Sequence, residues 1–261
     1  MKKKVDIIAS SYNEADNVSP FFNETTKYLD NKYIYNILYV NDGSTDKTYE
    51  RVLEIREKLK SEKNENLKVS IVSFVHNFGH EAAMCAGLDK SDADYLIFMD
   101  VDLQNPPKKI PETMEAFKKG ADCILLKRVK YNDTSIIKKF FSKSYYLFSK
   151  YVLRNKNERD VSDFFAIDKN VAKNIREEYN TRLRFIRSFA QNEAKKKAIV
   201  EYENAARNSG KSRYNFFKLA KLAIISELSR IKYLRKKYEA TIDEPIYIID
   251  EQQTIYEVKN E

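Results

Sequence analysis

Short apolar runs alternate with helical patterns through the first half of the chain, and this alternation limits the folds that the chain can form. The apolar runs predict strands at residues 5–9, 33–40, 69–75, 95–99 and 122–126. The segments between them carry apolar residues at helical spacing and predict helices at about 18–29, 46–60, 81–88 and 111–118. Alternating strands and helices predict an α/β fold, with a mostly parallel sheet covered by helices on both faces.

The second half of the chain has a different pattern and does not repeat the first. It predicts helices at 135–153, 169–178 and 183–192, a loop with a short strand at 160–167 and a strand at 198–202. Ser44 and Asp168 each precede a predicted helix and are placed to cap it. We divide the chain into a main domain at 1–212, a basic amphipathic helix at 213–240 and a tail at 241–261, to which the sequence assigns no role.

The composition excludes several classes of protein. Hydrophobic residues make up 43% of the chain, enough for a packed core, and the formal net charge is +8. Such a charge suits nucleic acid, an anionic membrane surface or phosphorylated substrates. No zinc-finger, homeodomain or RNA-recognition signature is present, so we expect no nucleic-acid partner.

Two further features concern the compartment. Cys85 and Cys123 lie inside apolar runs and are predicted to be buried thiols of a cytoplasmic protein, not a disulfide or a zinc site. The N-terminal residues 1–10 match neither a signal peptide nor a membrane anchor. Because the sequence has no run of about 18 apolar residues, we expect no transmembrane helix.

Two carboxylates follow the predicted strand at 95–99. Asp100 ends the apolar run, Asp102 comes two residues later, and Pro106 and Pro107 close the element. Both carboxylates can converge on one hard cation such as Mg²⁺ or Mn²⁺, which typically takes one or two carboxylates together with substrate phosphates. A single Asp-x-Asp is more often an acidic turn, so the neighbouring loops have to support a metal site.

Polar loops follow four of the predicted strands. Because the carboxyl ends of parallel strands meet at one edge of a sheet, these loops should form a ligand site there. His76 and His80 flank a glycine and do not share a helical face, which argues against a metal site formed by the two. The four loops are residues 11–14 (SYNE), 41–44 (NDGS), 76–79 (HNFG) and 100–104 (DVDLQ).

In their order and spacing, these four loops resemble those of family 2 glycosyltransferases, which have the GT-A fold. The resemblance is strongest to the branch of dolichol-phosphate mannose synthase and bacterial polyprenyl-phosphate glycosyltransferases, and it covers about residues 5–225. It implies a Rossmann-like, mostly parallel sheet flanked by helices, here with the amphipathic helix at 213–240 added. The main domain would then be the catalytic domain.

The resemblance also implies roles for individual residues. Asp163 and Asp102 would be catalytic, with Asp163 near the sugar and the acceptor. Asp100, Asp102 and Gln104 would bind Mg²⁺ or Mn²⁺. The donor nucleotide would contact Tyr12, Asn13, Glu14, Asp42, Gly79 and Asp100. A later loop that includes Gly210 would bind donor and acceptor phosphates through Arg207, Ser212, Arg213 and Tyr214.

The chain departs from the family pattern at three points. Ser10 stands where a proline is usual, and Phe165 stands where an arginine follows the catalytic Asp-Phe pair. A cationic contact from that position is therefore absent or supplied by Arg128, Arg182 or Arg187. We also expect the chain to lack the membrane-spanning helices that many bacterial relatives carry after the last motif.

These observations predict an inverting, metal-dependent enzyme that moves a sugar from a UDP- or GDP-sugar to a polyprenyl phosphate at the membrane surface. The basic helix can lie on an anionic bilayer, which would make the protein peripheral at the inner face of the cell membrane. Packing of that helix on the body of the protein or on another subunit is an equal alternative, so a homo-oligomer stays open.

Other functions also stay open. The acceptor could instead be a sugar hydroxyl of a cell-surface glycan or glycolipid, with Asp163 as the base. A GT-A module that binds nucleotide sugars without catalysis is a second alternative. A sugar-1-phosphate nucleotidyltransferase is disfavoured, because the loop after the first strand has no glycine.

Overall fold

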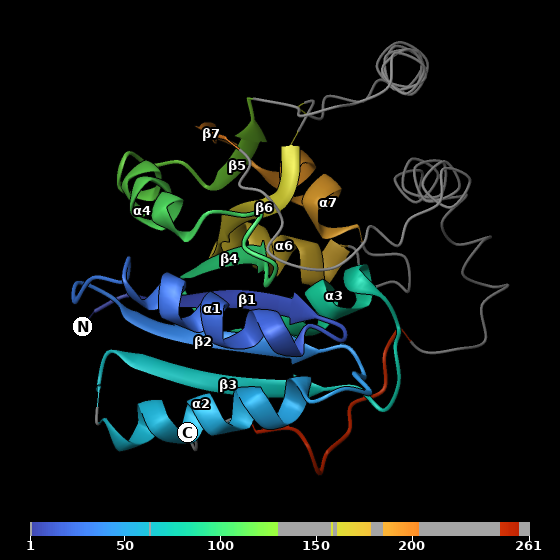
Figure 1. Cartoon of the computed structure of the whole chain (residues 1–261). Helices are drawn as coiled ribbons and strands as arrows, with labels where there is room; N and C mark the ends of the chain where they lie inside the picture. Colours follow the sequence, from blue (N-terminus) through green and yellow to red (C-terminus); the bar gives the residue numbers. More distant parts are fainter. Residues whose placement is uncertain are drawn as a thin grey trace, which may run out of the picture.

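The fold is a three-layer α/β sandwich (Figure 1). The computed structural model describes residues 2–62, 64–129, 158, 161–178, 185–203 and 246–255. The sheet has the strand order β3-β2-β1-β4-β6-β5-β7. Its strands are β1 (Lys4–Ser11), β2 (Ile34–Asn41), β3 (Leu67–Ser73), β4 (Tyr95–Asp100), β5 (Cys123–Arg128), β6 (Val161–Asp168) and β7 (Lys197–Tyr202).

The sheet is mostly parallel, as predicted. Among the strands described, β6 alone runs antiparallel to its neighbours, and it lies between β4 and β5. The carboxyl ends of β1 to β5 and of β7 therefore meet at one edge of the sheet, together with the amino end of β6. Ligands of open α/β sheets bind beyond this edge.

Helices cover both faces of the sheet, because the strand residues that point to each face are apolar. One face packs on α1 (Ala15–Thr26), α2 (Thr48–Ser61) and α4 (Ile110–Lys118), and the other on α3 (His80–Lys90), α6 (Lys169–Glu178) and α7 (Ile186–Glu193). A 3₁₀ turn, η1 (Pro107–Lys109), precedes α4. On β4, Ile97 belongs to the first core and Phe98 to the second, as the two-residue period of a strand requires.

The predicted elements are present with shifted ends, and one detail of the prediction was wrong. Ser44 does not cap α2; its hydroxyl accepts a hydrogen bond from Asn13, and Asp46 accepts one from the Thr48 amide instead. The short strand predicted within 160–167 is β6, which includes Asp163. The cap of α6 by Asp168 is confirmed, since its Oδ1 accepts the amide of Val171 at 2.8 Å. The helices predicted at 135–153 and 213–240 lie outside the described residues.

Residues 246–255 cover the free edge of β3. Ile255 and Ile71 exchange two backbone hydrogen bonds of 2.8 Å, and the Asp250 amide donates to the Ser73 carbonyl. Figure 1 draws this segment in red beside β3. Part of the tail for which the sequence assigned no role thus pairs with an edge strand that would otherwise expose its backbone groups.

Two further expectations concern the whole chain. Both cysteines are buried free thiols, as predicted. Within the described residues, none of the helices is long and apolar enough to span a bilayer.

Candidate active site

The loops after β1 and β2 are tied together at the carboxyl edge of the sheet. The Asn13 amide donates to Ser44 Oγ at 2.9 Å, and the Thr45 amide donates to Asn13 Oδ1 at 2.8 Å. Asn13 adopts a φ of +54°, which asparagine tolerates better than most residues. The predicted nucleotide-binding residues of these two loops therefore lie next to one another.

Glycine is required where the loop after β2 meets the loop after β3. Gly43 has a φ of +63°, and a Cβ atom there would lie 2.2 Å from the carbonyl carbon of His76. Gly79 also has a positive φ, but a Cβ there would meet nothing within 4 Å. The first glycine is thus needed for close approach and the second only for its backbone angle.

Asp42 organises the loop after β3. Its carboxylate accepts hydrogen bonds from the Phe78 amide at 2.7 Å, from the Gly79 amide at 2.9 Å and from Asn77 Nδ2 at 2.8 Å. The residue is only 3% exposed, and burial raises the pKa of its carboxyl to about 6, although the two amides counteract this. Asp42 thus fixes the position of Gly79, another predicted donor contact.

Tyr12 and Glu14 lie at the same edge and are partly exposed. The Glu14 amide donates to Thr48 Oγ1 at 3.0 Å, and its carboxylate accepts from Asn17 Nδ2 at 2.5 Å. These contacts fix the first turn of α1 against α2. The loops after β1, β2 and β3 therefore come together as predicted.

The acidic loop after β4 has a strained backbone. Asp102 is 7% exposed and accepts a hydrogen bond from the Gln104 amide at 3.1 Å. Leu103 between them has a φ of +61°, which is uncommon for a residue with a side chain. Asn105 donates to Asp100 Oδ2 at 3.1 Å. The surrounding loop thus fixes the positions of both acids.

The antiparallel strand β6 brings Asp163 next to Asp100. Phe98 pairs with Phe165 in the β4–β6 ladder, so two residues further on Asp100 faces Asp163. Phe98 and Phe165 both point to the face covered by α3 and α7, and the alternation of side chains directs the two acids to the same face.

A histidine and an arginine at the starts of α3 and α7 accompany these acids. His80 lies between the two acids, with Nδ1 3.7 Å from Asp100 and Nε2 3.8 Å from Asp163. Its Nδ1 is also 2.9 Å from Ser10 Oγ, the residue that replaces the usual proline. Arg187 donates from Nη1 to Asp163 Oδ1 at 2.6 Å. The cluster therefore combines acids and bases at the centre of the edge.

The charges of this cluster shift its pKa values in different directions. Burial raises the pKa of Asp100, and the charges of Asp163 and Asp102 raise it further against the effect of His80. Burial also opposes ionisation of Asp163, but Arg187, His80 and Arg128 hold its pKa below the usual range. Burial lowers the pKa of His80, yet the nearby carboxylates outweigh it and the pKa is raised.

Glu81 adds another acid beside this cluster. Burial, with the charge of Asp163, raises the pKa of Glu81 to about 7. Its Oε2 atom is buried and has no hydrogen-bond partner in the described part of the chain. Glu81 is therefore an acid that is protonated more easily than an ordinary glutamate.

The acids fit a divalent cation that a substrate helps to hold. Within the described residues, no three His, Cys, Asp or Glu side chains are placed to hold a metal ion by themselves. Mg²⁺ and Mn²⁺ usually bind through one or two carboxylates and complete their coordination with substrate phosphates. Asp100, with a side chain 31% exposed, and Asp102 supply that pair, and Asp163 adds further negative charge nearby.

The predicted substitutes for the missing arginine can be compared. Phe165 is buried and stacks on Phe98 with ring centroids 4.6 Å apart, so it cannot contact a phosphate. Arg187 contacts Asp163, and Arg128 donates to the hydroxyl of Tyr202 at 3.0 Å. Arg182 lies outside the described residues, as do the predicted acceptor residues Arg207, Ser212, Arg213 and Tyr214.

Sequence reasoning missed several residues of the site. His80 was considered only as a metal ligand, although its place directly after the loop of β3 could have located it. Glu81, Asn105 and Tyr202 gave no signal in the sequence, because their neighbours in the site come from distant segments.

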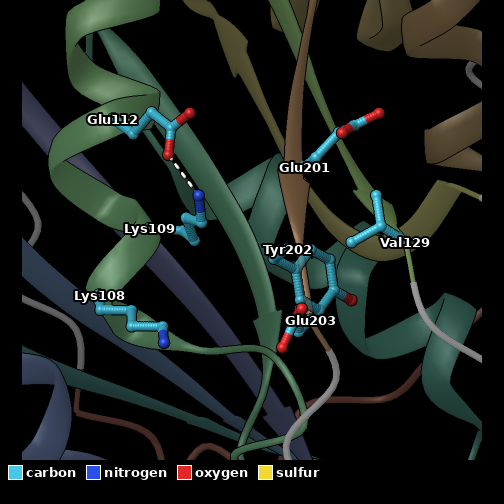
Figure 2. A pocket seen from close by; sticks show the side chains of 7 residues that line it. All are labelled: Lys108, Lys109, Glu112, Val129, Glu201, Tyr202 and Glu203. Carbon is cyan, nitrogen blue, oxygen red and sulfur yellow. Dashed lines mark hydrogen bonds and ion pairs between the residues drawn. The ribbon is translucent and has the colours of Figure 1, made fainter.

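A cavity of about 420 Å³ opens beside Tyr202 (Figure 2). It is lined by Lys108, Lys109, Glu112, Val129, Glu201, Tyr202 and Glu203.

Known glycosyltransferases are similar to this chain in sequence. A model of the family "Glycosyl transferase family 2" matches residues 6–176. The prophage bactoprenol glucosyl transferase homolog of Escherichia coli (strain K12) is 31% identical over 226 residues, which cover 85% of this chain and 70% of that protein. The bactoprenol glucosyl transferase of Shigella phage SfV has the same identity and coverage.

The comparison with solved structures supports the fold alone. Glucosyl-3-phosphoglycerate synthase from Mycobacterium tuberculosis, in complex with Mn²⁺, UDP-glucose and phosphoglyceric acid, superimposes with a TM-score of 0.57. It is 13% identical, and the match covers 89% of this chain and 80% of that one. The predicted GT-A fold is therefore confirmed.

Proposed function

The chain belongs to glycosyl transferase family 2, and from this premise we propose that it transfers a sugar from a nucleoside diphosphate sugar to a polyprenyl phosphate. The reaction would invert the anomeric centre and depend on Mg²⁺ or Mn²⁺. Family membership and fold support a glycosyltransferase. The names of the bactoprenol glucosyl transferases that it resembles support the acceptor class.

One observation in the site favours a phosphate acceptor over a hydroxyl. Asp163 would have to take the proton from a sugar hydroxyl, but its carboxylate is already bound by Arg187 at 2.6 Å and its pKa is lowered. A carboxylate with a lowered pKa is a weak base. A lipid phosphate is ionised before it attacks and requires no base.

The two ends of the site would then have different tasks. Asp100 and Asp102 would hold the divalent cation, which would neutralise negative charge on the departing diphosphate. The loops after β1 to β3, fixed by Asp42, Asn13 and Gly43, would hold the nucleotide. Arg187 and His80 would place positive charge where the anionic acceptor approaches the sugar.

The bond changes balance without a proton transfer. An oxygen of the lipid phosphate attacks the anomeric carbon from the face opposite the diphosphate. The bond between that carbon and the diphosphate oxygen breaks, and the nucleoside diphosphate leaves with the electron pair. The product is a glycosyl phosphate lipid. We place the reaction at the inner face of the cell membrane, because that is where such a lipid could be reached from the cytoplasm.

A second candidate acceptor is the hydroxyl of a glycan or glycolipid. It is favoured by the place of Asp163 opposite Asp100, at the centre of the site. In that reaction Asp163 would have to separate from Arg187 and accept the proton. The two acceptors can be distinguished by experiment.

The test is the release of nucleoside diphosphate from a panel of UDP- and GDP-sugars with Mn²⁺ or Mg²⁺, with and without undecaprenyl phosphate in detergent. We expect release that requires the lipid and is lost in Asp102→Ala. The control is Asp16→Ala, which removes an exposed aspartate of α1. Slow hydrolysis without lipid stimulation would favour the hydroxyl acceptor. Metal-dependent donor binding without turnover would indicate a binding module, and no donor binding would overturn the enzyme proposal.

A further inference from the structure

A chain of hydrogen bonds leads from the far side of the sheet to Asp100. Arg128 at the end of β5 donates from Nε to the Tyr202 hydroxyl at 3.0 Å. Tyr202 at the end of β7 donates to Asn105 Oδ1 at 3.2 Å. Asn105 then donates from Nδ2 to Asp100 Oδ2 at 3.1 Å. Three segments that are distant in sequence thus connect to the first acid of the metal site.

We propose that Tyr202 and Asn105 are positioning residues that set the orientation of the Asp100 carboxylate toward the cation and the donor diphosphate. This inference rests on the proposed function, in which Asp100 is a ligand of that cation. Neither residue would touch the substrate. Both would act through the carboxylate that they orient.

The direction of every bond in the chain follows from the guanidinium. Arginine can only donate, so the Tyr202 oxygen accepts from Arg128 and its own hydrogen is available for Asn105. The Asn105 carbonyl oxygen accepts that hydrogen, which leaves the amide nitrogen to donate to Asp100. An aspartate at position 105 could not donate this bond when ionised. The amide is therefore matched to both of its neighbours.

Burial makes the chain rigid. Asn105 is completely buried and Tyr202 is 2% exposed, so water does not replace these hydrogen bonds. Tyr202 is paired with Arg128 in the β5–β7 ladder, and its ring packs edge-on against Phe164 with centroids 6.1 Å apart. The hydroxyl is therefore held by the sheet itself.

Asp100 needs such a donor because two further carboxylates, Asp102 and Asp163, lie near it. Its Oδ1 is 3.7 Å from His80 Nδ1, and the other ring nitrogen of His80 is 3.8 Å from Asp163. A carboxylate between two others would turn away from them unless one oxygen is held. Asn105 holds Oδ2, which keeps the carboxylate in one orientation. Partners of this kind typically contribute 10- to 100-fold to metal affinity or activity.

The test compares two tyrosines that each lose one hydroxyl. Tyr202→Phe removes the relay bond and keeps the ring against Phe164. Tyr95→Phe is the control, because its hydroxyl accepts from Lys3 at 2.6 Å and Tyr95 begins β4 at the opposite edge of the sheet. Electron paramagnetic resonance of free Mn²⁺, with saturating UDP or GDP, gives the affinity of each variant for the cation. Thermal unfolding gives its stability.

We expect Tyr202→Phe to weaken Mn²⁺ binding by about 10-fold or more, and Tyr95→Phe to leave it unchanged. Loss of one hydrogen bond should lower Tm by only about 2–4 °C in either variant. Asn105→Leu, which is close to asparagine in size, should weaken Mn²⁺ binding at least as much as Tyr202→Phe. If Tyr202→Phe fails to fold, the Mn²⁺ affinity of Asn105→Leu tests the positioning role by itself.

Two results would overturn the inference in different ways. Equal Mn²⁺ affinity in the wild type, Tyr202→Phe and Asn105→Leu would reject the positioning role and leave the proposed function intact. A wild-type protein that binds no nucleotide in the presence of metal would reject the proposed function and this inference together.

Discussion

Arg187 at the start of α7 binds the carboxylate of Asp163 on β6, with 2.6 Å between Nη1 and Oδ1. Arg187 supplies a cation beside Asp163, in a chain that has Phe165 where the resemblance to the family implies an arginine. The two side chains are 38% and 35% exposed, so both are accessible from the edge of the sheet. The contact explains why the pKa of Asp163 stays low in spite of burial.

Replacing Arg187 by methionine should raise the pKa of Asp163 and remove positive charge from the acceptor side. We expect kcat to fall about 100-fold, because the acceptor phosphate loses a cation near the sugar. A shift of the acid limb of the pH–rate profile to higher pH would show that Asp163 acts as a base, and would favour the hydroxyl acceptor. The profile of lipid-dependent nucleotide release between pH 4 and 9 measures both effects.

The control for this substitution is Arg51→Met. It removes an arginine of α2 that pairs with the exposed Asp16 at 3.1 Å and donates to the Ala15 carbonyl at 2.7 Å, and neither contact involves Asp100 or Asp163. A profile for Arg187→Met that coincides with that of Arg51→Met would show that the Arg187–Asp163 pair has no part in the reaction.

Two glycines with positive φ allow the geometry of the donor loops to be tested. Gly43→Ala should lower the stability by more than about 2 kcal/mol and weaken UDP or GDP binding, because its Cβ would clash with the His76 backbone. Gly79→Ala adds backbone strain of about 1–2 kcal/mol without a clash. Urea unfolding and nucleotide titration compare the variants. Equal losses in both variants would mean that the close approach at Gly43 is not required.

Glu81 makes the stability depend on pH. Its pKa is about 7 in the folded protein and near the usual value of about 4.5 in the unfolded chain. Between these values the folded state binds more protons than the unfolded state, so the stability falls as the pH rises from 4.5 to 7. Glu81→Gln should remove this loss and raise the stability at pH 8 by up to about 3 kcal/mol.

Glu50→Gln is the matched control for Glu81→Gln. Glu50 lies in the first turn of α2, and Glu81 lies in the first turn of α3, so both substitutions remove the same interaction with a helix N-terminus. Unlike Glu81, Glu50 is exposed to solvent. Chemical unfolding at pH 5 and pH 8 gives the comparison. If both variants change stability equally at the two pH values, Glu81 does not carry the raised pKa.

The sequence was sufficient for the layers of the fold and for the four loops that follow β1 to β4. Its strands and helices follow from local periodicity, and Asp42, Asn13, Gly79 and the Asp100–Asp102 pair lie where parallel strands end. The insertion of β6 between β4 and β5 was not predictable from local patterns, because strand order depends on contacts between distant segments. That insertion is what brings Asp163 to Asp100.

Sequence reasoning missed some residues of the site for the same reason, because contacts between distant segments place them there. His80 stands at the start of a helix. Only the packing of α3 against β1, together with the pairing of β6 with β4, places it between two acids. In the sequence, Tyr202 looks like an ordinary strand residue. Only the pairing of β7 with β5 brings it next to Arg128. The pairing of residues 246–255 with β3 also joins segments far apart in the chain.

The central claim is that the sugar is joined to a lipid phosphate, and the product tests it most directly. The protein would be incubated with a radiolabelled UDP- or GDP-sugar, Mn²⁺ and undecaprenyl phosphate, and the organic extract analysed by chromatography and mass spectrometry. We predict one sugar attached to the lipid through its phosphate, with inverted anomeric configuration. Label recovered only as free sugar, or only on the hydroxyl of an added glycan, would contradict the account.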